Sequence, residues 1–143
     1  MFTSVQSRAN AYRRIAAETS VQGASPHHLV GLLYDALLQS IASARGALAR
    51  KDIEAKGMAI GKAVRIIEEG LKAGLNLEEG GEIAANLFDL YVYSIKRLTQ
   101  ANLHNDEAAL VEVTQLIEPL ADAWKHIKGG AAVASQPTPG PGA

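Results

Sequence analysis

One long amphipathic segment, from Ser25 to about Arg50, most constrains what this chain folds into. Serine is favoured immediately before a helix and proline is tolerated at the first helical position, so Ser25-Pro26 marks a helix start. Apolar residues then recur at the spacing of one helix face. This face carries Leu29, Leu33, Ala36, Leu37, Ser40, Ala44 and Leu48.

The apolar face of this segment is wider than one buried stripe needs, which is an arc of about 100°. The residues that widen it are Val30, Tyr34, Leu38, Ile41 and Ala42. We therefore expect this helix either to lie at the centre of a bundle or to keep a second apolar face for a partner.

Four further helical segments are expected from the same periodicity. The first covers residues 3–19, and the second begins at Asp52 and ends at 70–74, where two glycines weaken the helix. The third covers 82–102, and the fourth runs from Asp106 to about Ile127. The segment 76–81 reads as a connector because Gly80-Gly81 supplies backbone angles that other residues resist. The inward face of the segment 82–102 begins with Ile83, Leu87 and Leu90.

The two ends of the chain differ from the middle. The segment 1–19 has a thin apolar stripe, so we expect a mobile, loosely docked helix. The segment 128–143 is rich in glycine and proline and is expected to be disordered. Pro119 lies inside the last helical segment and is expected to kink it near Gln115 to Pro119.

The expected fold is an all-α, antiparallel up-down bundle over residues 1–127, with four main helices plus the N-terminal one. Connections between the helical segments are short, which makes sequential helices antiparallel neighbours. A chain of 143 residues is large enough to bury such a core in one domain.

Composition argues against several classes of function. The net charge is -1 and no concentrated basic face is present, which disfavours nucleic-acid binding. The chain has no cysteine, so it has no disulfide or zinc-thiolate site. Neither a signal peptide nor an apolar run of about 18 residues occurs, so we expect a cytosolic protein without a membrane span.

Catalytic motifs are not found. Helical-bundle metalloenzymes hold their metals with inward carboxylates and a Glu-x-x-His pair. This sequence contains no Glu-x-x-His. The spacing of Glu118, Asp122 and His126 aligns them on one helix face, but a solvated polar face is the favoured interpretation. His27 and His28 are expected to be exposed. We therefore expect that the chain is not an enzyme and that it binds no metal or cofactor. A carboxylate-metal enzyme stays a disfavoured alternative.

Two polar residues lie near apolar stripes. Asp35 is interpreted as a helix-edge residue that makes a hydrogen bond or salt bridge. Asn86 either fixes the register of the bundle from a buried position or bonds a partner's backbone, and both interpretations stay open. The additional apolar residues on the segment from Ser25 to Arg50 either belong to the core or form a groove that receives an amphipathic helix.

Several motifs follow one another in a fixed order along the chain, and none is a catalytic fingerprint. The first two are Ala11-Tyr12 and Ala24-Ser25-Pro26-x-x-Leu29-Val30-x-x-Leu33-Tyr34-Asp35, followed by Lys62-Ala63 with Ile66-Ile67-Glu68. The longest is Gly80-Gly81-Glu82-Ile83-Ala84-x-Asn86-Leu87-x-x-Leu90-Tyr91-x-Tyr93, which continues through Leu98, Ala101-Asn102 and Asn105-Asp106, and Ala123-Trp124 lies near the end. In the order and spacing of these motifs, the chain resembles the FliS family of flagellin export chaperones from Ala11 to Ile127.

The resemblance implies a cytosolic helical chaperone. Members of the family bind the C-terminal segment of newly made flagellin, prevent its premature polymerisation and aid its delivery to the membrane export gate of the flagellar type III apparatus. The alternative is a helical adaptor for another flagellar or regulatory protein. The oligomeric state, monomer or weak dimer, is left open.

The resemblance also suggests protein-binding residues. In the family a mobile N-terminal segment takes part in binding cargo or the gate, and Tyr12 and Ile15 match it here. We expect Leu33, Tyr34, Leu90, Tyr91 and Leu98 to line or support the cargo surface, although leucine and tyrosine at helical spacing are more often core residues.

Overall fold

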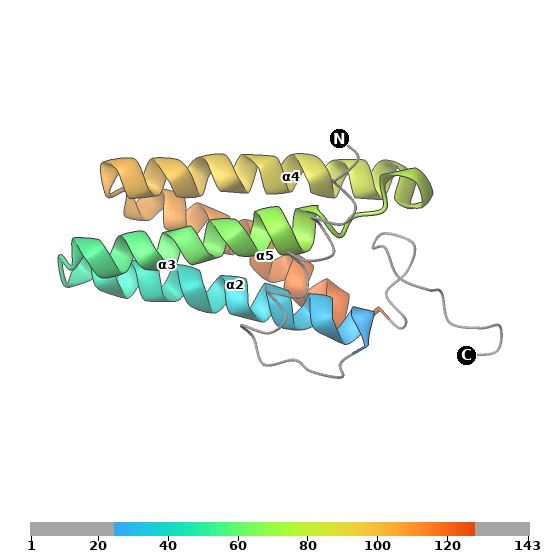
Figure 1. Cartoon of the computed structure of the whole chain (residues 1–143), viewed down its shortest axis with the longest axis horizontal. Coiled ribbons are helices and arrows are strands. Elements are labelled where there is room, and N and C mark those ends of the chain that lie inside the picture. The colour runs from blue at the N-terminus through green and yellow to red at the C-terminus, as the bar shows by residue number, and fades with distance from the viewer. Residues whose placement is uncertain (1–24, 128–143) are drawn as a thin grey trace.

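The computed structural model describes residues 25–127, which form an antiparallel bundle of four helices (Figure 1). The predicted N-terminal helix, with Tyr12 and Ile15, and the predicted disorder of 128–143 lie outside these residues. The elements are α2 (Pro26–Ala49), α3 (Ile53–Arg65) continued by the π-helical segment η1 (Ile66–Lys72), α4 (Leu77–His104) and α5 (Glu107–Lys125). The all-α bundle expected from the sequence is confirmed.

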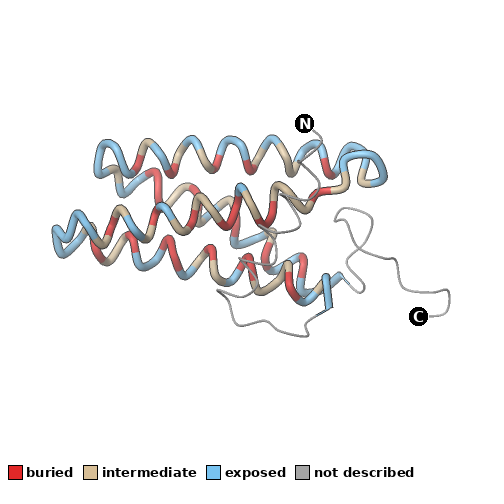
Figure 2. Tube along the Cα trace, viewed as in Figure 1, coloured by how far each residue is buried: buried red, intermediate tan, exposed pale blue. Residues whose placement is uncertain are grey.

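The start of α2 follows the sequence signal. The Ser25 side chain accepts a hydrogen bond from the His28 backbone N–H at 3.1 Å, and Pro26 occupies the first turn. α2 packs against both α3 and α5 and is buried along its length (Figure 2). The residues that widen the apolar face, such as Val30 and Leu38, therefore pack against the core formed with these two neighbours.

The far end of the bundle is held by a buried lysine. Lys56, near the start of α3, is 3% exposed and donates to the Asn102 carbonyl at 2.8 Å and to the Asn105 side chain at 2.5 Å. Asn105 adopts left-handed backbone angles (φ 53°) and ends α4. A cation at the C-terminal end of a helix is favourable because the last carbonyls carry partial negative charge.

The start of α4 corrects the sequence interpretation. α4 begins at Leu77 rather than Glu82, because the Asn76 side chain accepts a hydrogen bond from the Glu79 backbone N–H and caps a turn within the expected connector. Gly81 still breaks the helix geometry, with φ 58° and ψ -135°, so the first turn of α4 is set at an angle to the rest. At its other end α4 extends to His104.

Pro119 lies within α5, but the helix continues without a break from Glu107 to Lys125. The Pro119 ring is exposed. The helix is therefore not interrupted where the kink is expected.

The core contains a polar pair that joins opposite helices. α2 and α4 lie on opposite sides of the bundle (Figure 1). The hydroxyls of Tyr34 on α2 and Tyr91 on α4 are nevertheless 2.5 Å apart, and both residues are 2% exposed. Burial raises the pKa of both phenols, that of Tyr91 well above its usual value. Both hydroxyls stay neutral, and one donates its proton to the other, which gives each buried oxygen a hydrogen-bond partner.

No helix among the described residues is long and apolar enough to cross a membrane.

Candidate protein-binding surface

Most of the sequence-predicted cargo residues lie in the core. Leu33 and Leu98 are fully buried, and Tyr34 and Tyr91 are each 2% exposed. These four residues hold the helices together and have no surface that a partner can touch in this conformation. Leu90 is half-buried and reaches the edge of the core. Tyr12 and Ile15 lie outside the described residues.

The start of α2 is fastened to the end of α5. Trp124 donates its indole N–H to the His27 carbonyl at 2.9 Å, and the His27 ring stacks on the indole with centroids 4.8 Å apart. Tyr34 meets the same indole edge-on. His27 is therefore half-buried, which corrects the expectation that it is exposed, whereas His28 is exposed. The predicted helix-edge role of Asp35 is confirmed by its ion pair with Lys125 at 3.5 Å.

α5 contacts both α2 and α4, and at its first residue Glu107 pairs with Arg45 of α2 at 3.3 Å. Near its start, Glu112 bonds Tyr93 and Arg97 of α4. Near its end, the described polar contacts of Trp124 and Lys125 with other helices are made with α2. In Figure 1, α5 begins beside the C-terminal end of α4 and descends toward the start of α2.

Exposed or half-buried apolar side chains lie on the sides of α4 and α5 that carry Arg97 and Glu112. On α5, Leu116 and Leu120 follow Glu112 at four-residue steps and share its face toward α4. On α4, Ile83 and Leu90 share a face with Arg97, which points toward α5. Ile83 is 61% exposed, and the others are half-buried. We call this set the apolar flank: Ile83, Leu87, Leu90, Leu116 and Leu120.

Ile83 shows what periodicity missed. Its position on the helix places it on the inward stripe, yet its side chain is largely exposed. Asn86, on the same part of α4, is also exposed, which contradicts the buried, register-fixing interpretation.

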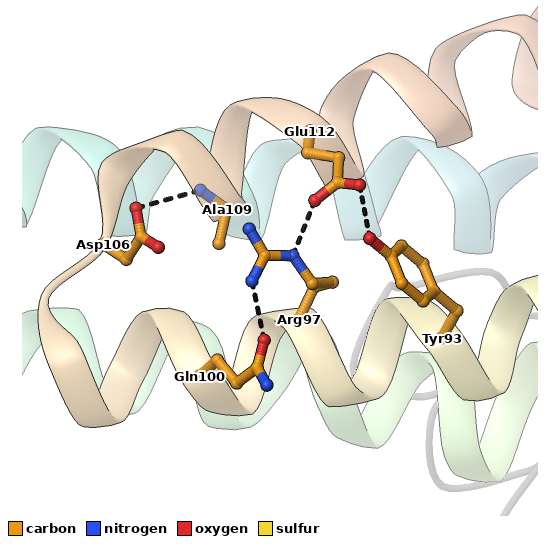
Figure 3. A network of polar contacts seen from close by, with 6 residues as sticks. All are labelled: Tyr93, Arg97, Gln100, Asp106, Ala109 and Glu112. Carbon is orange, nitrogen blue, oxygen red and sulfur yellow. Dashed lines mark hydrogen bonds and ion pairs between the residues drawn. The ribbon is translucent and has the colours of Figure 1, made fainter.

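A polar network closes the other end of the α4–α5 pair (Figure 3). The Tyr93 hydroxyl donates to Glu112 at 2.5 Å and the Arg97 Nε donates to the other carboxylate oxygen at 2.6 Å. Arg97 also donates to the Gln100 side chain at 2.6 Å. The hydrogen bond from Tyr93, followed by that from Arg97, lowers the pKa of Glu112, and the bond to Glu112 raises the pKa of Tyr93.

The network predicts a pH dependence of stability. Because the folded-state pKa of Glu112 is lowered, its stabilisation is complete above the ordinary value of 4.5 and is lost as pH falls through the folded-state pKa. Glu112→Gln should therefore be less stable than the wild type near neutral pH. The difference in unfolding free energy, measured by urea titration, should shrink between about pH 5 and pH 3. A difference that stays constant over this range would contradict the role of the Glu112 charge.

The polar residues on the outside of α5 do not converge. Glu118, Asp122 and His126 are all exposed, as the solvated-face interpretation predicted. His126 Nδ1 instead lies 2.8 Å from the Asp122 backbone carbonyl. Within residues 25–127, no three His, Asp or Glu side chains are grouped so as to hold a metal ion.

Comparison with known proteins identifies a family whose members this chain resembles. The family described as "Flagellar protein FliS" matches residues 8–131. The chain is 50% identical to "Flagellar secretion chaperone FliS" of Salmonella typhimurium over 82% of its own length and 87% of the relative. It is 44% identical to "Flagellar secretion chaperone FliSB" of Pseudomonas aeruginosa, over 81% and 91% of the two chains. A FliS of Bacillus subtilis is 35% identical, over 76% and 80%.

Proposed function

The chain belongs to the FliS family of flagellar secretion chaperones, and we propose that it binds the C-terminal segment of flagellin in the cytosol and prevents its premature polymerisation. Delivery of this cargo to the flagellar type III export gate is the second part of the proposal. The chain acts as a binding protein in both parts, without catalysis, metal or cofactor.

The apolar flank supports this proposal more than any other feature. An amphipathic cargo helix buries its apolar face against exposed and half-buried apolar side chains of its partner, and the flank offers such side chains. The flank combines residues from both helices, with Ile83 and Leu90 on α4 and Leu116 on α5. Of the residues that the resemblance suggested, Leu90 belongs to the flank. Leu33, Tyr34, Tyr91 and Leu98 support it from the core.

The N-terminal segment has a proposed part in the same site. Tyr12 and Ile15 match the family's mobile segment, and we propose that this segment covers the cargo surface in the free protein and is displaced by cargo.

Titration calorimetry with flagellin tests the proposal. Full-length flagellin and a form lacking about 40 C-terminal residues are titrated into the intact chaperone. We expect one-to-one binding of the full-length form, with a favourable enthalpy and a negative heat-capacity change because the cargo folds as it binds. Removal of the C-terminal segment should abolish this binding.

The outcomes separate the candidate functions. Equal binding of both forms would refute the C-terminal segment as cargo. Binding of neither form would refute the flagellin proposal and favour a helical adaptor for another flagellar or regulatory protein.

A further inference from the structure

Two carboxylates border the apolar flank on α4. Glu82 and Asp89 directly precede the flank residues Ile83 and Leu90, and both acidic residues are exposed. One residue step turns an α-helix by about 100°, so each carboxylate lies beside the flank, on the solvent side of α4. We call Glu82 and Asp89 the acidic border. A helix that packs on the flank places one of its edges beside both carboxylates.

The charge around the flank is of one sign. Over 77–95 of α4 the chain has four acidic residues and no lysine or arginine, and over 113–124 of α5 it has two acidic residues and no lysine or arginine. The whole chain is nearly balanced, with 14 basic and 15 acidic residues. Negative charge is therefore concentrated on the two stretches that carry the flank.

The basic side chains near these stretches are already paired. Arg97 pairs with Glu112 at 2.6 Å, and Lys125 pairs with Asp35 at 3.5 Å. Within residues 25–127, the two carboxylates of the acidic border have no ion-pair partner. Their charge is therefore available to a segment that binds the flank.

The chain's own N-terminal sequence has the complementary pattern. Periodicity predicts a helix over 3–19 with Tyr12 on its apolar stripe. Arg8 and Arg13 fall on opposite sides of this stripe, and residues 1–17 include no acidic residue. The segment that is proposed to cover the cargo surface in the free protein thus has basic residues at the edges of its apolar face.

We infer that the acidic border makes the flank selective for segments whose apolar face is edged by lysine or arginine, and that the C-terminal segment of flagellin is held in this way. This inference rests on the proposed binding of flagellin. Exposed charge pairs at the rim of an interface contribute modestly to affinity and more strongly to the rate of encounter and the choice of partner. An amphipathic segment with neutral edges buries the same apolar area but binds more weakly.

Two forms of a C-terminal flagellin peptide test the selectivity by fluorescence anisotropy with the full chain. One is the natural peptide, and in the other every lysine and arginine is replaced by glutamine. The wild type should prefer the natural peptide by about tenfold at about 50 mM salt, and the preference should shrink at about 500 mM salt because salt screens exposed charges. In the double variant Glu82→Lys with Asp89→Lys the preference should disappear. Comparing two peptides on one protein cancels any effect of the substitutions on folding or on the N-terminal segment.

The matched control is the double variant Glu54→Lys with Glu118→Lys, which makes the same change in net charge at exposed positions. Glu54 lies two residues before Lys56, which bonds the far end of α4, about 30 Å along the helix axis from Glu82. Glu118 follows Leu116 by two residues and so lies on the opposite side of α5. This control should keep the preference of the wild type.

The outcomes separate this inference from the proposed function. Equal binding of the two peptides by the wild type would overturn the inference and leave flagellin binding in place. So would a preference that survives in the border variant, a preference that the control loses equally, or a natural segment without lysine or arginine. If neither peptide binds the wild type, flagellin binding itself is refuted, and this inference with it.

Discussion

Replacing Ile83 and Leu116 together by aspartate is expected to weaken binding of the flagellin C-terminal segment by about 3 kcal/mol or more, roughly 150-fold. Each residue is on the apolar flank, and burial of one such side chain contributes about 1.5–3 kcal/mol. The aspartates would in addition place charges against the apolar face of the cargo. Calorimetry or fluorescence anisotropy with a C-terminal flagellin peptide measures the effect.

The matched control is the double variant Met58→Asp with Ile53→Asp. Met58 is 72% and Ile53 is 52% exposed on α3, outside the flank, so this variant introduces the same two charges without touching the proposed cargo surface. Melting curves of both variants exclude unfolding as the cause. Equal affinity in the flank variant and the control would show that cargo binds elsewhere on the bundle.

Replacing Leu98 by alanine is expected to lower the free energy of unfolding by about 3 kcal/mol, within the usual range of 2–5 kcal/mol for such a change. The Leu98 side chain is completely buried, so the change removes apolar contacts and leaves a cavity. Urea unfolding measures the loss. Leu103→Ala, on the same helix and 74% exposed, should stay within about 0.5 kcal/mol of the wild type.

The same variant decides how Leu98 takes part in binding. Under conditions in which Leu98→Ala is fully folded, its affinity for cargo should equal that of the wild type, because a docked cargo cannot touch a fully covered side chain. A fully folded variant that binds cargo much more weakly would show that the bundle opens and exposes Leu98 on binding.

Local signals along the chain predicted the helices well. Ser25 and Pro26 define the start of α2, and Asp52 and Asp106 cap α3 and α5 through their side chains. The sequence does not predict the start of α4, because Gly80 and Gly81 indicate a connector there. The cap at Asn76 depends on one side-chain hydrogen bond, which the sequence does not reveal. The π-helical geometry of η1 was also missed, since its apolar spacing resembles that of an α-helix.

The binding surface was harder to predict than the fold. Helical periodicity tells which side of α4 Ile83 occupies, but not whether a neighbouring helix extends far enough to cover it. That depends on the path of α5, whose end contacts α2 through Trp124 and Lys125. For the same reason Leu33, Tyr34 and Leu98 could not be separated from surface residues by spacing alone.

The fastening of α2 to α5 gives the protein an intrinsic spectroscopic probe. Trp124 is the only tryptophan in the chain, and its indole is stacked on His27 and hydrogen-bonded to its backbone. His27 lies in the first turn of α2, directly after the segment that contains Tyr12 and Ile15. Any event that moves the start of α2 away from α5 must change the polarity around this indole. Its emission therefore follows the junction between the N-terminal segment and the bundle without an added label.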